Sequence, residues 1–170
     1  MKSVYHFLLI TFIFISSPAV YADKSYQMSK VQIKAQLQAD GSMEVSEYRT
    51  YNFEDDFRYA YRTFPKSEKV SFSDFDITEN NRNYLLSDTE KPGTFWIKEK
   101  KSYTEVRWFF RAENEKRTFT IRYTVNDAVV RFRDAAVLHF QFIGEEWNKS
   151  SWNVSLELIP PDSLSRQEVK

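Results

Sequence analysis

A strict alternation of apolar and polar residues recurs along this chain and limits its fold more than any other feature. The clearest example is TFTIRYTV, in which Phe119, Ile121, Tyr123 and Val125 alternate with polar residues. Successive side chains of a strand point to opposite faces of a sheet, so this period of two predicts strands with one buried face. The segment VQIKAQL, residues 31–37, has the same pattern.

Turn-forming sequences separate these segments. Asp40-Gly41 predicts a two-residue hairpin turn, because Asp-Gly readily supplies the positive φ values that such a turn needs. The segments TFWIKE and YTEVRWFFRA predict a hairpin around Lys100–Ser102. About eight short strands separated by turns predict an all-β fold, a two-sheet antiparallel β-sandwich.

The segment DAAVLHFQFIGEEW, residues 134–147, fits two local structures. As a strand, its alternate apolar residues would line one face. As a helix, it would begin at Asp134 as the N-cap. Its short length, its aromatic residues and Gly144 near its end favour the strand.

The first 22 residues have the features of a secretory signal peptide. Lys2 supplies a positive charge, and the apolar core Val4–Ile15 is shorter than the roughly 20 residues that span a bilayer. Val20-Tyr21-Ala22 places small side chains at the −3 and −1 positions of a cleavage site. We expect cleavage after Ala22, which would leave residues 23–170 as one extracytoplasmic domain, either periplasmic or secreted. An uncleaved signal would instead anchor the protein in the membrane.

The composition excludes several classes of function. The chain has no cysteine, and therefore no disulfide, thiol nucleophile or thiolate metal ligand. His139 is the one histidine outside the signal peptide, so a single chain cannot form a zinc site of two or three histidines. The 24 basic residues equal the 24 acidic ones, and this balance offers no electrostatic basis for binding nucleic acid. We expect no metal and no cofactor.

One segment carries charges where its alternation predicts buried side chains. The inward positions of MEVSEYRTYNF, residues 43–53, include Glu47 and Arg49. A buried charge without a partner costs several kcal/mol, so the strand either leaves the core there or pairs its charges. We expect Glu47 to form an ion pair with Arg62 of YRTFP, with Asp134 as a competing partner. The functional alternative is a polar pocket that binds a ligand.

Five segments together resemble a known family: DGSMEVSEYRTYNF, FRYAYRTFP, RTFTIRYTVNDAV, DAAVLHFQFIGEEW and NVSLELIP. In this order they are similar to the extracytoplasmic N-terminal domain of the YciQ-like predicted membrane proteins, domain of unknown function 2207, over about residues 31–161. The resemblance implies a bacterial envelope location. It also implies membrane association if the chain is part of a longer membrane protein. It implies no activity.

Catalytic residues are not evident. Glu145 and Glu146 are adjacent, so on a strand they point to opposite faces and do not easily flank one glycosidic bond. Asp134 with Glu47 is an alternative carboxylate pair. We expect His139 to face solvent and Trp147 to be a packing anchor rather than a ligand platform. The sequence therefore favours a non-catalytic binding or assembly module that recognises an envelope protein or component. The alternatives are an envelope carbohydrate-processing enzyme that uses carboxylates, or a carbohydrate-binding module with exposed aromatic residues.

Overall fold

The computed structural model describes residues 24–67, 70–143 and 153–161, and these residues form twelve strands and no helix. The predicted all-β class is confirmed, although short additional strands raise the number above eight. The bounds are β1 Ser25–Leu37, β2 Met43–Glu54, β3 Asp56–Pro65, β4 Ser71–Glu79, β5 Arg82–Asn83, β6 Leu85–Leu86, β7 Thr94–Glu99, β8 Tyr103–Glu113, β9 Lys116–Asn126, β10 Val129–Arg131, β11 Ala136–Leu138 and β12 Val154–Ile159. No helix in the described ranges is long and apolar enough to cross a bilayer.

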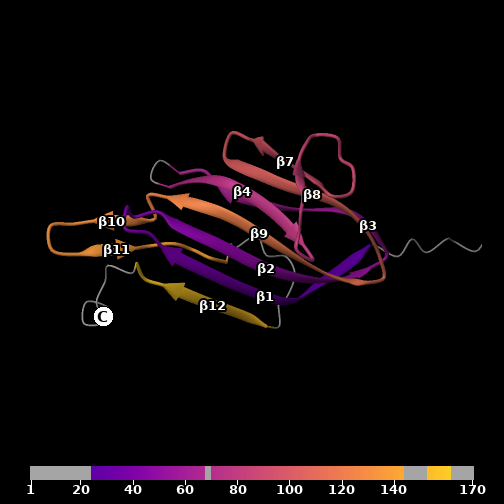
Figure 1. The fold of residues 1–170 in the computed structure, drawn as a ribbon, viewed down its shortest axis with the longest axis horizontal. Helices are drawn as coiled ribbons and strands as arrows, with labels where there is room; N and C mark the ends of the chain where they lie inside the picture. Colours follow the sequence, from indigo (N-terminus) through magenta and orange to yellow (C-terminus); the bar gives the residue numbers. More distant parts are fainter. Residues whose placement is uncertain (1–23, 68–69, 144–152, 162–170) are drawn as a thin grey trace, which may run out of the picture.

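The strands form two large sheets and one small hairpin (Figure 1). The six-stranded sheet has the order β12-β1-β2-β9-β4-β5, the four-stranded sheet has the order β3-β8-β7-β6, and β10 pairs with β11. Most pairs are antiparallel, but β12 runs parallel to β1, and β6 runs parallel to β7. The predicted two-sheet β-sandwich is confirmed, but its sheets are mixed, whereas we expected antiparallel pairing. Hydrophobic alternation specifies the buried face of a strand and not the direction of its neighbour.

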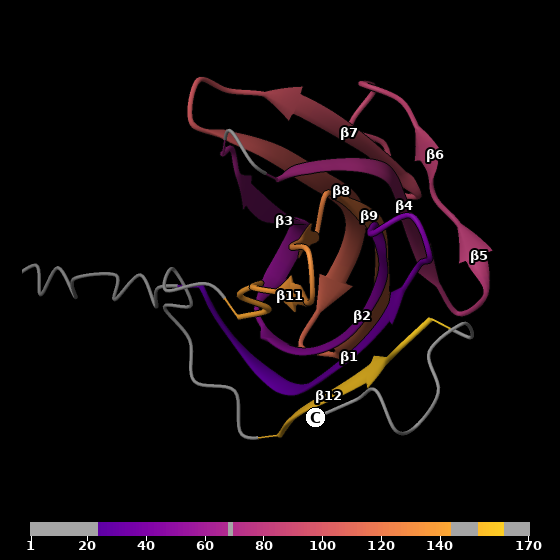
Figure 2. The ribbon, with the colours of Figure 1, turned by 90° about the vertical axis from the view of Figure 1, so that its left-hand side faces the viewer.

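The two sheets are joined at two neighbouring corners. β2 continues into β3 through Asp55, and β8 continues into β9 through Asn114 and Glu115. Asp55 and Asn114 have φ of 85° and 47°, a conformation that Asp and Asn tolerate better than most residues. The Asp55 amide donates to Asn114 Oδ1 at 2.8 Å, which ties the corners together. Both sheets therefore belong to one folded ribbon, which Figure 2 shows curving around the core.

The core lies between the sheets and is rich in aromatic residues. Phe119 of β9 contacts Trp108 and Phe110 of β8, with ring centroids 5.7 Å and 4.8 Å apart. The alternating positions identified in TFTIRYTV are all buried. The inward positions of residues 43–53 are also buried without a break in the β2–β9 register, so the strand does not leave the core at its charged residues.

The β1–β2 turn differs from the predicted two-residue turn. Gly41, and not Asp40, has a positive φ, 96°. The Gly41 amide donates to Gln38 O at 3.1 Å, and Gln38 N donates to Ser42 O at 2.9 Å, so the loop is one residue longer than predicted. Asp40 instead accepts hydrogen bonds from the amide and hydroxyl of Ser42, which hold the pKa of its carboxyl below the usual value. Hydrogen bonds to the Asp40 side chain therefore stabilise the turn, in place of the positive φ predicted for Asp40.

The strand prediction for residues 134–147 holds over a short stretch. β11 covers Ala136–Leu138 only, and Asp134 lies in the exposed connection from β10. Beyond β11, Phe140 and Phe142 are half-buried against the edge of the core, although their backbone is irregular. Residues 144–147 lie outside the described part of the chain.

Candidate functional site

A buried polar cluster connects the two sheets. Glu47 of β2 is fully buried, and its Oε1 lies 2.7 Å from Arg62 Nη2 of β3. The same oxygen accepts a hydrogen bond of 2.6 Å from the hydroxyl of Tyr123 on β9. Its other oxygen, Oε2, lies 2.7 Å from both Nε and Nη2 of Arg49. The structure thus brings Glu47 and Arg62 together, as the cost of an unpaired inward charge suggested, and adds two partners.

The charges in this cluster stabilise one another. Burial alone would raise the pKa of Glu47, but attraction to Arg49 and Arg62 and the hydrogen bond from Tyr123 outweigh burial and hold this pKa below its usual value. Burial and the adjacent Glu47 carboxylate raise the pKa of Tyr123. Glu47 is therefore ionised and Tyr123 protonated at neutral pH. The Arg62 guanidinium also stacks on Phe64, 4.7 Å from the ring centroid.

The third predicted member of this cluster, Asp134, is not found there. Asp134 is exposed in the β10–β11 connection, and the ion pair of Arg62 in the described part of the chain is made with Glu47. Asp134 is therefore not a member of the cluster, because β10 and β11 form a separate hairpin. Trp147 lies outside the described residues. His139 is exposed, as expected. Because Glu47 is sealed from solvent, the cluster is suited to holding the sheets together rather than to binding a ligand.

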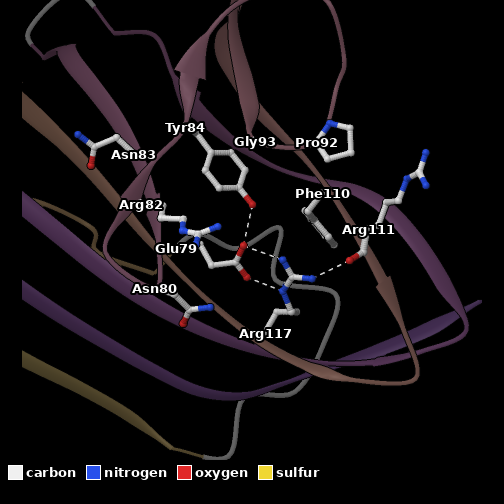
Figure 3. Close-up of a pocket in the computed structure, with 10 residues that line it drawn as sticks. All are labelled: Glu79, Asn80, Arg82, Asn83, Tyr84, Pro92, Gly93, Phe110, Arg111 and Arg117. Atoms are coloured by element: carbon white, nitrogen blue, oxygen red, sulfur yellow. Dashed lines mark hydrogen bonds and ion pairs between the residues drawn. The ribbon is translucent and has the colours of Figure 1, made fainter.

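An open pocket of about 640 Å³ lies elsewhere, between the edges of the two sheets (Figure 3). Residues of β4, β5, β8 and β9 and of the loop before β7 line it: Glu79, Asn80, Arg82, Asn83, Tyr84, Pro92, Gly93, Phe110, Arg111 and Arg117. Its rim includes a tight turn, because Asn80 and Asn81 have φ of 48° and 61° and connect the paired residues Glu79 and Arg82. Two positive φ values are typical of a two-residue type I′ turn, which Asn favours.

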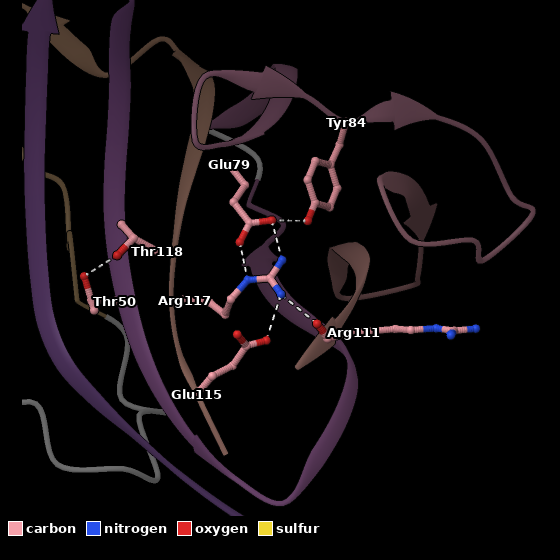
Figure 4. A network of polar contacts seen from close by, with 7 residues as sticks. All are labelled: Thr50, Glu79, Tyr84, Arg111, Glu115, Arg117 and Thr118. Carbon is pink, nitrogen blue, oxygen red and sulfur yellow. Dashed lines mark hydrogen bonds and ion pairs between the residues drawn. The ribbon is translucent and has the colours of Figure 1, made fainter. Parts of the chain in front are cut away.

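A hydrogen-bond network fixes one wall of this pocket (Figure 4). Arg117 binds both carboxylate oxygens of Glu79, with Nη2 2.6 Å from Oε2, and also binds the Arg111 carbonyl and the Glu115 carboxylate. Tyr84 donates from its hydroxyl to Glu79 Oε2 at 2.9 Å. The hydrogen bonds to Glu79 raise the pKa of Arg117, while burial and then the Glu79 carboxylate raise the pKa of Tyr84. Both side chains therefore stay protonated.

Two other arginines of the pocket differ from Arg117. Arg82 and Arg111 are exposed, and neither forms an ion pair with a described residue. The Arg111 side chain extends away from the Glu79–Arg117 pair, and the carbonyl oxygen of Arg111 is the atom that accepts from Arg117 (Figures 3 and 4). Guanidinium groups bind carboxylate and phosphate groups through paired hydrogen bonds. The pocket can therefore receive an anionic group.

The pocket lacks an arrangement for two-carboxylate chemistry among its described lining residues. Glu79 is the one acidic residue among the lining residues, and its carboxylate already accepts hydrogen bonds from Arg117 and Tyr84. Glycoside hydrolysis typically needs two carboxyl groups roughly 5–10 Å apart across the scissile bond. No group of three or more potential metal ligands occurs among the described residues either.

Exposed aromatic residues form a third feature, on the outer face of the four-stranded sheet. Tyr59 and Tyr61 of β3 are 45% and 55% exposed. The Arg107 guanidinium lies 4.5 Å from the Tyr59 ring centroid and 4.9 Å from that of Trp96 on β7. Arg107 also pairs with Glu105 at 2.6 Å. Tyrosine, tryptophan and arginine are the residue types that dominate binding energy at protein surfaces.

Sequence reasoning identified the buried cluster but missed the pocket. Glu47 was noticeable because it interrupts an apolar row. The pocket residues come from separate elements and range from exposed Arg82 and Arg111 to buried Phe110, so no single sequence pattern connects them. The one local signal was the turn-forming run Asn80–Asn83, which marks the rim but not its partners on β8 and β9.

Comparison with known proteins agrees with the resemblance seen in the sequence. The model of a family described as the N-terminal domain of a predicted membrane protein, DUF2207, matches residues 27–170. No curated protein matches the chain. The family match covers all twelve strands apart from the first two residues of β1. The chain therefore belongs to the DUF2207 family of N-terminal domains of predicted membrane proteins.

Proposed function

We propose that this domain is an extracytoplasmic binding module that holds a carboxylate- or phosphate-bearing envelope component in the pocket between β4–β5 and β7–β8. The observation that carries this proposal is the contrast between the arginines of the pocket. The Arg117 guanidinium donates hydrogen bonds to Glu79, Glu115 and the Arg111 carbonyl. Arg82 and Arg111, by contrast, form no ion pair with the described residues.

The fixed network and the free arginines have different roles in this proposal. Glu79, Arg117 and Tyr84 keep the pocket open and correctly shaped, because their hydrogen bonds are already made within the protein. Arg82 lies on β5 and Arg111 on β8, which belong to different sheets, so a ligand that binds both would bridge the two sheets. The amides of Asn80 and Asn83 can add neutral hydrogen bonds, which suit the hydroxyl or amide groups of a saccharide or peptide.

Envelope location is supported by the family description and by the signal-like start of the chain. Acidic saccharides and peptide carboxylates both occur on that side of a bacterial membrane. The shared chemistry is a single anion next to hydrogen-bonding groups. Binding at such a site weakens as salt screens the charges.

Calorimetric titration with an acidic oligosaccharide, oligogalacturonate, and with inorganic phosphate tests the proposal. We expect binding of at least one of these probes, and we expect Arg82→Gln with Arg111→Gln to weaken it by at least about tenfold, or roughly 1.4 kcal/mol. The matched control is Arg58→Gln, which removes an exposed arginine of β3 that pairs with Asp56 and does not line the pocket. Equal affinity for the double variant and the wild type would contradict the proposal.

A second candidate function is binding of neutral carbohydrate on the outer face of β3. The exposed rings of Tyr59 and Tyr61 favour it, because saccharides stack on aromatic surfaces. Titration with a neutral oligosaccharide separates this possibility from the first. Binding that is lost in Tyr59→Ala with Tyr61→Ala, but kept in the arginine double variant, would assign carbohydrate recognition to this face.

A further inference from the structure

The β10–β11 hairpin has an apolar face that no described part of the protein covers. Val130 pairs directly with Val137 across the hairpin, so both side chains lie on one face, and Phe132 follows two residues after Val130. Val130, Phe132 and Val137 are 48%, 61% and 46% exposed. Figure 1 shows the hairpin extending beyond the ends of both large sheets. Exposed apolar side chains gathered on a projecting element are typical of a contact surface.

The hairpin is held firmly at one end of the domain. The amide of Val129 donates to Gly41 O at 3.1 Å, and the Arg131 guanidinium donates to Ala39 O, so the hairpin is attached to the β1–β2 turn. The Phe132 amide donates to Ala135 O at 2.7 Å and closes the tip. The hairpin is therefore fixed in direction, which allows its tip to reach a surface ahead of the sheets.

β12 ends at the same end of the domain. β12 runs parallel to β1, and Ile159 near its end pairs with Gln36 just before the β1–β2 turn. The last described residues of β12, the turn and the hairpin therefore share one end, as Figure 1 shows. In a protein whose N-terminal domain this is, the membrane part follows β12. The hairpin thus lies at the end of the domain from which such a membrane part would continue.

The chemistry of the tip suits a lipid surface. Phe132 lies between Arg131 and Arg133, all exposed. Aromatic and aliphatic side chains enter the boundary between headgroups and acyl chains, while arginines interact with the lipid phosphates. We propose that the β10–β11 hairpin inserts its tip into the membrane interface next to the domain. Three side chains give a weak contact, which is sufficient to orient a domain that the rest of its protein already holds near the membrane.

A single fluorescent label tests this proposal cleanly, because the chain has no cysteine. The variant Phe132→Cys carries an environment-sensitive nitrobenzoxadiazole label at the tip. The matched control is Leu85→Cys, another highly exposed apolar position, on β6 of the four-stranded sheet. Both labelled full-length chains are mixed with vesicles of phosphatidylethanolamine and phosphatidylglycerol. Any contact made by residues 1–22 is common to both chains and cancels in the comparison.

We expect vesicles to increase the emission of the label at position 132 several-fold and shift it to shorter wavelength, with little change at position 85. Brominated acyl chains should quench the first label and not the second. An equal response of both labels would overturn the proposal, and so would no response at position 132 in a chain that flotation shows to be bound to the vesicles. A rise that depends on protein concentration without vesicles would instead show a protein contact, and would equally overturn it.

A second measurement uses unlabelled protein. Val130→Ser with Phe132→Ser should reduce flotation with vesicles several-fold while the melting temperature stays unchanged, because both side chains project outward. The pocket variants Arg82→Gln and Arg111→Gln should leave flotation unaffected. This outcome separates the membrane contact from the proposed anion site. Unchanged flotation in the serine variant would contradict the proposal.

Discussion

Replacing Glu47 by glutamine removes the charge from the buried cluster and keeps the size of the side chain. In the folded protein, Oε1 accepts from Tyr123 and Arg62, and Oε2 accepts from Arg49. A glutamine retains one acceptor oxygen and presents an amide donor in place of the other. That donor would face a guanidinium or a hydroxyl, so at least one arginine would lose its partner inside the core.

The size of the effect follows from burial. Glu47 is fully buried, and the side chains of Arg49 and Arg62 are 6% and 14% exposed, so solvent cannot replace the lost contacts. Removing one member of a buried ion pair typically costs 3–5 kcal/mol. We expect Glu47→Gln to lower the free energy of unfolding by about 3–5 kcal/mol, which corresponds to about 10 °C in melting temperature for a chain of this size.

Urea unfolding followed by circular dichroism measures this difference. The matched control is Asp76→Asn, which breaks the exposed 3.0 Å ion pair with Arg122 on the outer face of the same sheet and should cost below about 1 kcal/mol. Adding Arg62→Met to Glu47→Gln should cost less than the sum of the two single changes, because the stranded guanidinium is then gone. Arg49 remains, so the double variant should still be less stable than the wild type.

The loss of stability caused by Glu47→Gln should also depend on pH. The pKa of Glu47 in the folded protein lies below its usual value of 4.5, so the folded state binds this proton less readily than the unfolded state does. The stability that the carboxylate contributes is therefore complete above pH about 5 and is lost as the pH falls below 4.5 through the lower folded pKa. The difference between wild type and Glu47→Gln should shrink on acidification. A loss below 1 kcal/mol at neutral pH, or strict additivity with Arg62→Met, would refute the reasoning.

Three further changes test other parts of the molecule. Gly41→Val should lower the free energy of unfolding in urea by about 1–2 kcal/mol, because φ is 96° at this position. An unchanged urea midpoint would mean that the positive φ of Gly41 is not needed for stability. Asn114→Ala should cost a similar 1–2 kcal/mol, since it removes the 2.8 Å hydrogen bond to the Asp55 amide and a residue that tolerates positive φ; unaltered stability would mean that the corners fold independently. N-terminal sequencing of the exported protein should begin at Asp23, and recovery of intact Met1 would show an uncleaved anchor.

Local patterns in the sequence were sufficient to identify the buried faces of the long strands. Phe119, Ile121 and Tyr123 are buried as their alternation predicts, because the direction of a strand side chain depends only on its position along the backbone. The cost of an unpaired buried charge predicted a cationic partner for Glu47, and the place of Arg62 in YRTFP, a segment of the family resemblance, selected that arginine. The sequence did not reveal Tyr123 as a partner, because its spacing marks it simply as another inward aromatic residue.

The tertiary structure alone decided how these faces meet. The parallel pairing of β12 with β1, the corners at Asp55 and Asn114, and the separate β10–β11 hairpin all depend on the path of the chain, which a period of two does not encode. The pocket arises because β5 and β8, which belong to different sheets, both contribute to its lining. The sequence thus determined which side chains are buried, since that is a local property. Which exposed side chains become neighbours is a property of the whole fold.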